Sequence, residues 1–208
     1  MRQWLMQTGR RPAKLLKPIK ITQLRARRDF FGELIQIDGS VHDWFEGRAP
    51  KCCLLVFIDD ATSRIMHLRF EEAETTFGYF RCVKDYVLQY GCPVAFYTDR
   101  YGVFTVNRAD KLSGPLGITQ FQRAMRELKI EIILANSPQA KGRVERANQT
   151  MQDRLIKEMR LKGISSMEAA NAYLPEFIKA HNKKFAIDAL DPADSHRALS
   201  ISREQLDK

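Results

Sequence analysis

Three acidic residues that lie far apart in the chain, Asp38, Asp99 and Glu145, could together form a metal-dependent site. Asp38 and Asp99 each end a short apolar segment, and Glu145 follows the apolar Val144 in a segment with helical spacing. Three carboxylates without a cation would repel one another, and a divalent cation removes that repulsion. Mg²⁺ binds carboxylate, water and phosphate oxygens. Two such ions about 3.5–4 Å apart can cleave a phosphodiester by activating a water or hydroxyl and stabilising the leaving oxygen.

Spacing alone identifies this triad only weakly. The chain contains 25 acidic residues, and an Asp at the end of a strand commonly caps a turn. We assign Asp59 and Asp60 to a hairpin turn for that reason. The other acids that compete for a place in the site are Glu127, Glu131 and Glu158.

Hydrophobic periodicity indicates the elements that must bring the acids together. Period-two alternation and unbroken apolar runs predict strands, whereas apolar residues at helical spacing predict helices. The expected strands are residues 33–38, 52–58, 64–70, 94–99 and 130–135. The expected helices are residues 75–90, a segment from Thr119, a long helix that follows the turn at 136–138 and runs to about Lys162, and a last helical region from Ser165, which Pro175 kinks or starts anew.

These elements predict an α/β fold with a mixed five-stranded sheet, three antiparallel strands plus two parallel strands, and helices on both faces. Short connections join the first three strands, so these form an antiparallel meander. A helix crosses between the first and fourth strands, which can therefore be parallel neighbours. Asp38, which ends the first strand before Gly39, would then lie beside Asp99 at the edge where open α/β sheets bind ligands.

Three segments carry a resemblance to a known family. Residues 35–40 (IQIDGS), 97–100 (YTDR) and 137–148 (SPQAKGRVERAN) resemble the DDE catalytic core of retroviral integrases and insertion-sequence transposases, the rve superfamily. The third is the most specific, because it is similar almost position by position to the integrase stretch N-P-Q-S-Q-G-V-V-E-S-M-N. Residues 38–48 and 58–64 resemble bacterial transposases of the ISNCY type, and the likeness covers about residues 30–185.

The resemblance implies an RNase H-like fold and two Mg²⁺ or Mn²⁺ ions in each active site. It gives the metal-ligand role to Asp38, which would bridge the ions, and to Asp99 and Glu145, which would each hold one. The implied reaction is cleavage at a transposon end followed by transfer of the freed 3′-OH to target DNA. The implied partners are these DNAs and further copies of the chain, with no membrane, in the bacterial cytoplasm at the nucleoid.

Polar and basic residues surround the start of the helix that carries Glu145. A helix N-terminus and nearby cations favour phosphate, so we expect DNA contacts here, although a capped helix start with solvated charges would have the same composition. Retroviral integrases carry lysines one and two turns beyond the glutamate, where this chain has Gln149 and Gln152. The candidate DNA-binding residues are Gln139, Lys141, Arg143, Arg146 and Asn148.

The charge distribution supports a division into three parts. Residues 1–28 carry Lys and Arg but no Asp or Glu, and they account for the whole net charge of +9. A block of one sign usually contacts a polyanion, although a solvated linker would also fit. We expect a basic N-terminal arm or linker at 1–29, the integrase-type catalytic core at 30–163, and a C-terminal helical extension and tail at 164–208.

Two other functions stay open. A nuclease of the same fold would share the metal site, but residues 137–146 (SPQAKGRVER) argue against it. A non-catalytic DNA-binding or inhibitory transposase fragment is the other alternative, since related proteins carry an upstream helix-turn-helix region of which residues 1–10 would be a remnant. The intact triad argues against decay of the site.

The remaining residue types indicate a globular chain without an obvious membrane segment. No run of about 18 uncharged apolar residues is present, and no apolar stretch follows the basic N-terminus. Trp44 and Phe45 could stack on a DNA base, but we expect them to pack in the core or under a loop. Four cysteines without metal-ligand spacing are expected to be buried free thiols of a reducing compartment: Cys52, Cys53, Cys82 and Cys92.

Overall fold

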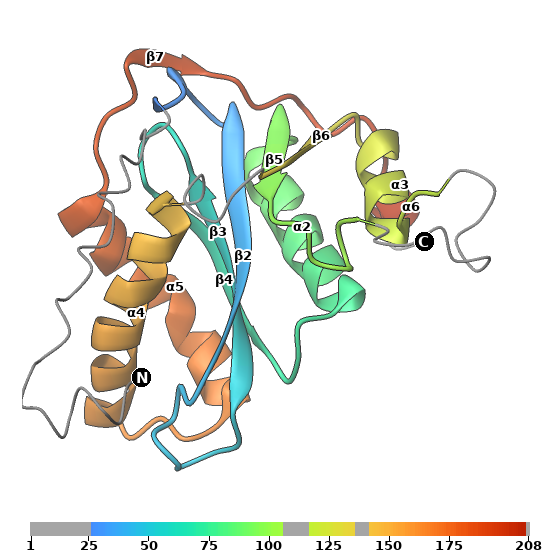
Figure 1. Ribbon diagram of the computed structural model, residues 1–208. Coiled ribbons are helices and arrows are strands. Elements are labelled where there is room, and N and C mark those ends of the chain that lie inside the picture. Colours follow the sequence, from blue (N-terminus) through green and yellow to red (C-terminus); the bar gives the residue numbers. More distant parts are fainter. Residues whose placement is uncertain (1–25, 106–116, 136–141, 207–208) are drawn as a thin grey trace, which may run out of the picture.

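A five-stranded sheet forms the centre of the computed structural model, which describes residues 26–105, 117–135 and 142–206. Its strands are β2 (Leu34–His42), β3 (Cys52–Asp59), β4 (Ile65–Glu71), β5 (Ala95–Thr98) and β6 (Glu131–Leu134). The spatial order is β4-β3-β2-β5-β6 (Figure 1). β2, β3 and β4 pair antiparallel, whereas β5 is parallel to β2 and β6 is parallel to β5. The predicted mixed sheet is therefore confirmed.

Helices cover both faces of this sheet, as predicted. They are α2 (Thr76–Tyr90), α3 (Gln120–Glu127), α4 (Gly142–Leu161) and α5 (Met167–Phe185). α2 and α3 lie on one face, and α4 and α5 lie on the other (Figure 1). Ile35 and Ile37 of β2 pack in the apolar cluster under α2 and α3. Because successive strand residues face opposite sides, Gln36, Asp38 and Ser40 face α4.

Residues next to the helix ends define where α2 and α3 begin and stop. The Thr75 side chain accepts a hydrogen bond from the Gly78 amide at the start of α2, and Gly91 follows its last residue with a φ of 92°. Thr119 and Gln122 form the reciprocal bonds of a capping box at the start of α3. These signals are local, which is why the sequence predicts them.

β2 is longer than predicted, so Asp38 lies within the strand and not at its end. Gly39 pairs with Leu55 of β3, and the pairing continues as far as His42 and Cys52. The predicted end at Gly39 is therefore wrong. Pairing with the long apolar β3 outweighs the low strand propensity of glycine.

The C-terminal region also departs from the prediction. α5 continues through Pro175 and does not start anew there, because Leu174 and Phe177 are buried in the same apolar cluster. The tail, where no strand is among those expected, contains β7 (Asp191–Asp194), which pairs with β1 (Phe30–Phe31), and α6 (Arg203–Leu206). The division into a core and an extension at residue 163 stays a prediction.

The four cysteines are buried and unpaired, as predicted. Burial raises the pKa of the Cys52 thiol to about 11 and that of the Cys53 thiol to about 12, so neither is a reactive thiolate near neutral pH. Within the described parts of the chain, no helix is both long and apolar enough to cross a membrane.

Two asparagines of α5 cover the outer edge of β4. Asn182 accepts a hydrogen bond from the Ile65 amide and donates one to the Ile65 carbonyl, both at 2.8 Å. Asn171 makes the same pair of bonds with Phe70, at 2.8 and 3.1 Å. An open strand edge is a template for pairing with another chain, so these carboxamides protect it.

We expect Asn182→Ala to lower the free energy of unfolding by about 1–3 kcal/mol, because two partly buried backbone groups of Ile65 lose their partner. Urea unfolding followed by circular dichroism measures the change. Asn182→Asp keeps the acceptor for the Ile65 amide but loses the donor to the Ile65 carbonyl, so its stability should lie between those of wild type and Asn182→Ala. An Asn182→Ala variant as stable as wild type would show that the edge does not need this cover.

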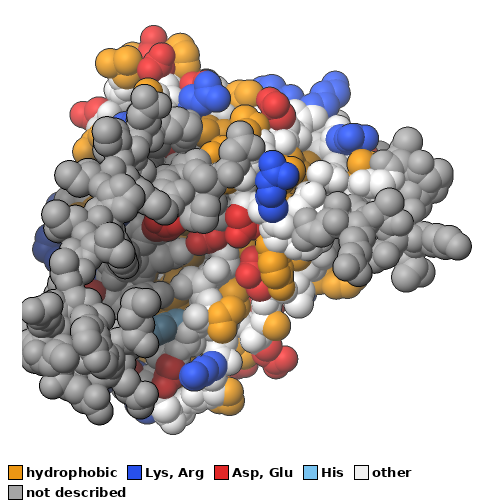
Figure 2. Space-filling view, viewed as in Figure 1, with side chains coloured by type: hydrophobic (Ala, Val, Ile, Leu, Met, Phe, Trp, Pro, Cys, Tyr) orange, Lys and Arg blue, Asp and Glu red, His pale blue; other side chains and the backbone are white. Residues whose placement is uncertain are grey.

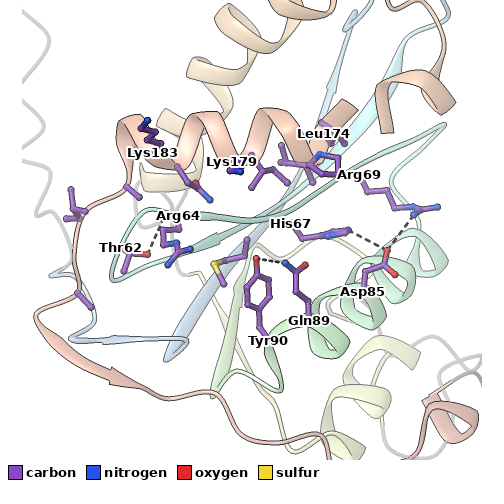
Figure 3. A pocket seen from close by; sticks show the side chains of 18 of the residues that line it. Thr62, Arg64, His67, Arg69, Asp85, Gln89, Tyr90, Leu174, Lys179 and Lys183 are labelled. Carbon is purple, nitrogen blue, oxygen red and sulfur yellow. Dashed lines mark hydrogen bonds and ion pairs between the residues drawn. The ribbon is translucent and has the colours of Figure 1, made fainter. Parts of the chain in front are cut away.

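A cavity of about 1120 Å³ lies along β4 between α2 and α5 (Figure 3). His67 of β4 points towards Asp85 of α2, with 3.8 Å between Nε2 and Oδ2. Nε2 has no hydrogen-bond partner in the described part of the chain. Burial lowers the pKa of His67 to about 4, and nearby Asp85 offsets this only in part.

This pKa predicts that acid destabilises the protein through His67. Between pH 6.5 and about 4 the unfolded chain binds a proton that the folded chain does not, so the free energy of unfolding falls as the pH falls. Replacing His67 by Gln should remove this loss, which is about 3 kcal/mol at most. Denaturant unfolding from pH 4 to 7 measures the free energy of unfolding of both proteins. If this free energy changed with pH in the same way in wild type and in His67→Gln, the role of His67 would be disproved. The pKa of His181 is also lowered, so part of the wild-type slope should persist in the variant.

Candidate active site

Asp38 lies in β2, and Asp99 directly follows the neighbouring parallel strand β5. Gln36 of β2 pairs with Tyr97 of β5, and extending this register by two residues places Asp38 opposite Asp99. Neighbouring strands are about 4.8 Å apart, which brings the two acids to the same region of the sheet. Asp99 Oδ1 also accepts a hydrogen bond from the Tyr101 amide at 2.9 Å, so this residue caps the turn that follows β5.

α4 lies along β2 and contacts it once in each of three successive turns. The Val144 amide donates to Gln36 Oε1 at 3.2 Å. Asn148 Nδ2 donates to Asp38 Oδ2 at 2.8 Å. Gln152 Nε2 donates to Ser40 Oγ at 3.3 Å.

The spacing of these contacts follows from the geometry of the two elements. The contacts recur every four residues in α4, a rise of about 6 Å. They recur every two residues in β2, an advance of about 6.6 Å. Because the two repeats match, the helix and the strand stay in register from the first turn of α4 onwards.

The residue of α4 that bonds to Asp38, Asn148, lies one helical turn after Glu145. Glu145 is exposed in the first turn of α4, three residues before Asn148. Side chains three apart on a helix are neighbours, with about 5–6 Å between their Cβ atoms. Acidic side chains gather where α4, β2 and β5 meet (Figure 2). Even so, the described residues contain no group of three or more His, Cys, Asp or Glu side chains already arranged to hold a metal ion.

The chemistry around Asp38 nevertheless suits a divalent cation. The Asp38 carboxylate accepts the amide of Asn148, which turns the carbonyl oxygen of that carboxamide away from it. This oxygen, Asn148 Oδ1, is buried and has no hydrogen-bond partner among the described residues. A buried acceptor without a partner is rare, and it could accept from a water of a hydrated ion. The side-chain atoms that could bind a metal ion here are oxygens, which Mg²⁺ and Mn²⁺ prefer as ligands.

The predicted DNA-binding residues are only partly described. Gln139 and Lys141 lie outside the described residues, and Arg143 lies in the first turn of α4. Arg146 is exposed, whereas Asn148 is half-buried with its amide on Asp38. Gln152, where retroviral integrases carry a lysine, instead contacts Ser40 of β2. DNA contact by these residues stays a prediction.

The competing acids Asp59 and Asp60 are buried beside the turn after β3, in agreement with their assignment to that turn. Asp59 accepts hydrogen bonds from the Gly32 amide at 3.0 Å and from the Thr62 amide and hydroxyl at 2.8 and 2.6 Å. Burial raises the pKa of the Asp59 carboxyl, although these three donors act in the opposite direction. Its bonds make Asp59 a structural residue of the turn.

Glu74 is a further acid that sequence reasoning missed, and it lies beside Gly39, the residue that follows Asp38. A Cβ added to Gly39 would lie 2.4 Å from the carboxyl carbon of Glu74, so the glycine leaves space for this side chain. The hydroxyl of buried Tyr79 donates to Glu74 Oε1 at 2.7 Å. The pKa of Tyr79 lies well above its usual value, chiefly through burial and then through Glu74. The glycine directly after Asp38 was the only sequence signal for this arrangement.

Sequence comparison identifies bacterial relatives. The chain is 49% identical over 206 residues to y4bF of Sinorhizobium fredii, a protein named as a transposase, and the match covers 99% of this chain and 45% of that protein. It is 37% identical over 193 residues to the transposase for insertion sequence IS1202 of Streptococcus pneumoniae, covering 89% and 41%. The chain is a relative of insertion-sequence transposases. It spans less than half the length of these relatives. No family model matches this transposase-like chain.

The fold is that of retroviral integrase catalytic cores. The HTLV-2 integrase catalytic core domain in complex with magnesium has a TM-score of 0.55 and 17% identity, over 82% of this transposase-like chain and 100% of that domain. A chain of the simian T-cell lymphotropic virus intasome in complex with PP2A regulatory subunit B56 gamma has a TM-score of 0.62 and 17% identity, over 91% and 66%. The expected RNase H-like fold is thus confirmed, and so is the resemblance to DDE transposases and integrases.

Proposed function

We propose that this chain is the catalytic domain of a DDE transposase, which cuts DNA at transposon ends and joins the freed 3′-OH to target DNA. The observation that carries the proposal is the hydrogen bond from Asn148 of α4 to Asp38 of β2, since Asn148 lies one helical turn after Glu145. The relationship to insertion-sequence transposases supports it.

Asp38, Asp99 and Glu145 would hold two divalent ions, Mg²⁺ or Mn²⁺. When bound, these ions supply an activated water or hydroxyl and stabilise the leaving oxygen of the phosphodiester. Asn148 keeps the Asp38 carboxylate in one orientation through its 2.8 Å hydrogen bond. Glu145, which is exposed and near the start of α4, can turn towards the two aspartates when the ions are present.

DNA would approach the start of α4. Helix N-termini attract phosphate, and Arg143 and Arg146 add positive charge within the first turns. The basic arm at residues 1–28 would hold further phosphates without sequence preference. Integrase cores are found in a dimeric form and in an intasome, and we propose that this chain likewise acts as an oligomer on DNA, at the nucleoid in the bacterial cytoplasm.

Incubation of the purified chain with Mg²⁺ and pre-nicked DNA ends tests the proposal against its alternatives. Strand-transfer products are the expected result. Hydrolysis without transfer would instead support an RNase H-like nuclease. DNA binding with neither reaction would support a non-catalytic or inhibitory transposase fragment.

A further inference from the structure

Gln36 is a polar residue buried in the middle of the sheet, directly beneath the start of α4. Its side chain is completely shielded from solvent. Nε2 donates to Asp60 Oδ1 at 2.6 Å, and Oε1 accepts from the Val144 amide at 3.2 Å. Both ends of the carboxamide are therefore used, as a buried polar group requires.

The bond to Val144 caps α4 from outside the helix. The first amides of a helix have no partner within it, and Val144 is the third residue of α4. Gln36 supplies the missing acceptor from β2, two residues before Asp38. The amide that it holds belongs to the residue directly before Glu145.

Asp60 determines which way the carboxamide of Gln36 points. Asp60 Oδ2 accepts from the Arg28 amide at 2.9 Å, and the Asp60 amide donates to the Leu34 carbonyl at 2.9 Å. A carboxylate has no hydrogen to donate and can only accept hydrogen bonds, so Asp60 binds the NH₂ group of Gln36. The carbonyl oxygen is then left for the start of α4.

We propose that Gln36, oriented by Asp60, is a positioning residue that sets the first turn of α4 so that Glu145 can complete the metal site. The inference rests on the proposed function, because it concerns the same three carboxylates. Gln36 itself touches neither ion nor DNA in this account. It acts on metal binding through the position of one helix turn.

The test compares Gln36→Glu with a matched change at the outer edge of β4. Asn171 uses its carboxamide in the same manner, accepting from the Phe70 amide and donating to the Phe70 carbonyl. Gln36→Glu and Asn171→Asp each keep an acceptor oxygen and remove the NH₂ donor. Gln36→Met and Asn171→Leu form a second, uncharged pair in case the first variant does not fold.

Three quantities are measured on the full chain: the thermal midpoint, the affinity for Mn²⁺ by titration calorimetry, and the Mg²⁺ concentration that gives half-maximal strand transfer. We expect the Gln36 variants to bind Mn²⁺ at least about tenfold more weakly and to need correspondingly more Mg²⁺. The Asn171 variants should lose thermal stability but keep wild-type values for both metal readouts.

A folded Gln36 variant with wild-type affinity for Mn²⁺ would overturn the inference and leave the proposed function intact. An equal loss of affinity in the Asn171 variants would also overturn it, because general destabilisation would then explain the effect. A wild-type chain that neither binds Mn²⁺ nor transfers strands would overturn the proposed function together with this inference.

Discussion

Glu145→Gln is expected to reduce strand transfer by about 1,000-fold or more, equivalent to about 4 kcal/mol of transition-state stabilisation. The carboxamide has nearly the shape of the carboxylate but lacks the negative charge that a divalent cation requires. Glu145 is exposed, and no hydrogen bond of its side chain is seen in the described structure, so the fold should not change. Gel assays of strand transfer in Mg²⁺ and of DNA binding measure the two effects, and binding should stay within about twofold of wild type.

The matched control is Glu127→Gln on α3. Glu127 is also an exposed helical glutamate, with an exposed side-chain fraction of 72%, and it makes a distant ion pair with Arg123 at 4.0 Å. This variant should retain full strand transfer. Transfer at the wild-type rate by Glu145→Gln in Mg²⁺ would refute the role of Glu145 as a metal ligand.

Trp44→Ala is expected to lower the free energy of unfolding by about 3–5 kcal/mol. The side chain is fully buried, packs edge-on to Phe70 with 5.7 Å between ring centroids, and donates from Nε1 to the Ser40 carbonyl at 2.9 Å. Phe45 beside it is also fully buried. The expected core role is thus confirmed, and neither ring is available to stack on a DNA base in this conformation.

Chemical denaturation measures the loss, with Trp44→Phe as the control. Phenylalanine keeps most of the buried apolar surface but loses the donor to the Ser40 carbonyl, so we expect a loss of only about 1–2 kcal/mol. A Trp44→Ala variant as stable as wild type would contradict the core assignment. Specific loss of DNA binding in a stable variant would instead favour stacking.

The sequence predicts those features that depend on neighbouring residues. The strand and helix periods follow from side chains two to four positions apart, and the caps at Thr75 and Thr119 follow from single turns. The antiparallel meander of β2, β3 and β4 and the parallel neighbours β2 and β5 were also predictable, because short links produce antiparallel neighbours and a crossing helix produces parallel ones.

The features that the sequence did not predict depend on partners far away in the chain. β2 continues beyond Gly39 because β3 is there to pair with it. The tail forms β7 because β1 offers a partner. Gln36 appeared only as a polar residue on a strand, and its contact with Val144 joins positions that are 108 residues apart.

The same reasoning applies to the site. The strand pattern predicted that the strands leading to Asp38 and Asp99 would be parallel neighbours, and the pairing of β2 with β5 confirms this. The match between the repeats of α4 and β2 could not be predicted, because it rests on three contacts between residues more than 100 positions apart. We expect the three carboxylates to close around the ions in the metal-loaded state.

Anomalous diffraction from crystals grown with Mn²⁺ tests most directly whether Asp38, Asp99 and Glu145 bind metal ions together. We predict anomalous peaks within bonding distance of carboxylate oxygens from Asp38, Asp99 and Glu145, with these peaks lost in crystals of Glu145→Gln or much reduced. Crystals at saturating Mn²⁺ that show no peak between these side chains would contradict the account. So would crystals in which the ions bind only elsewhere on the chain.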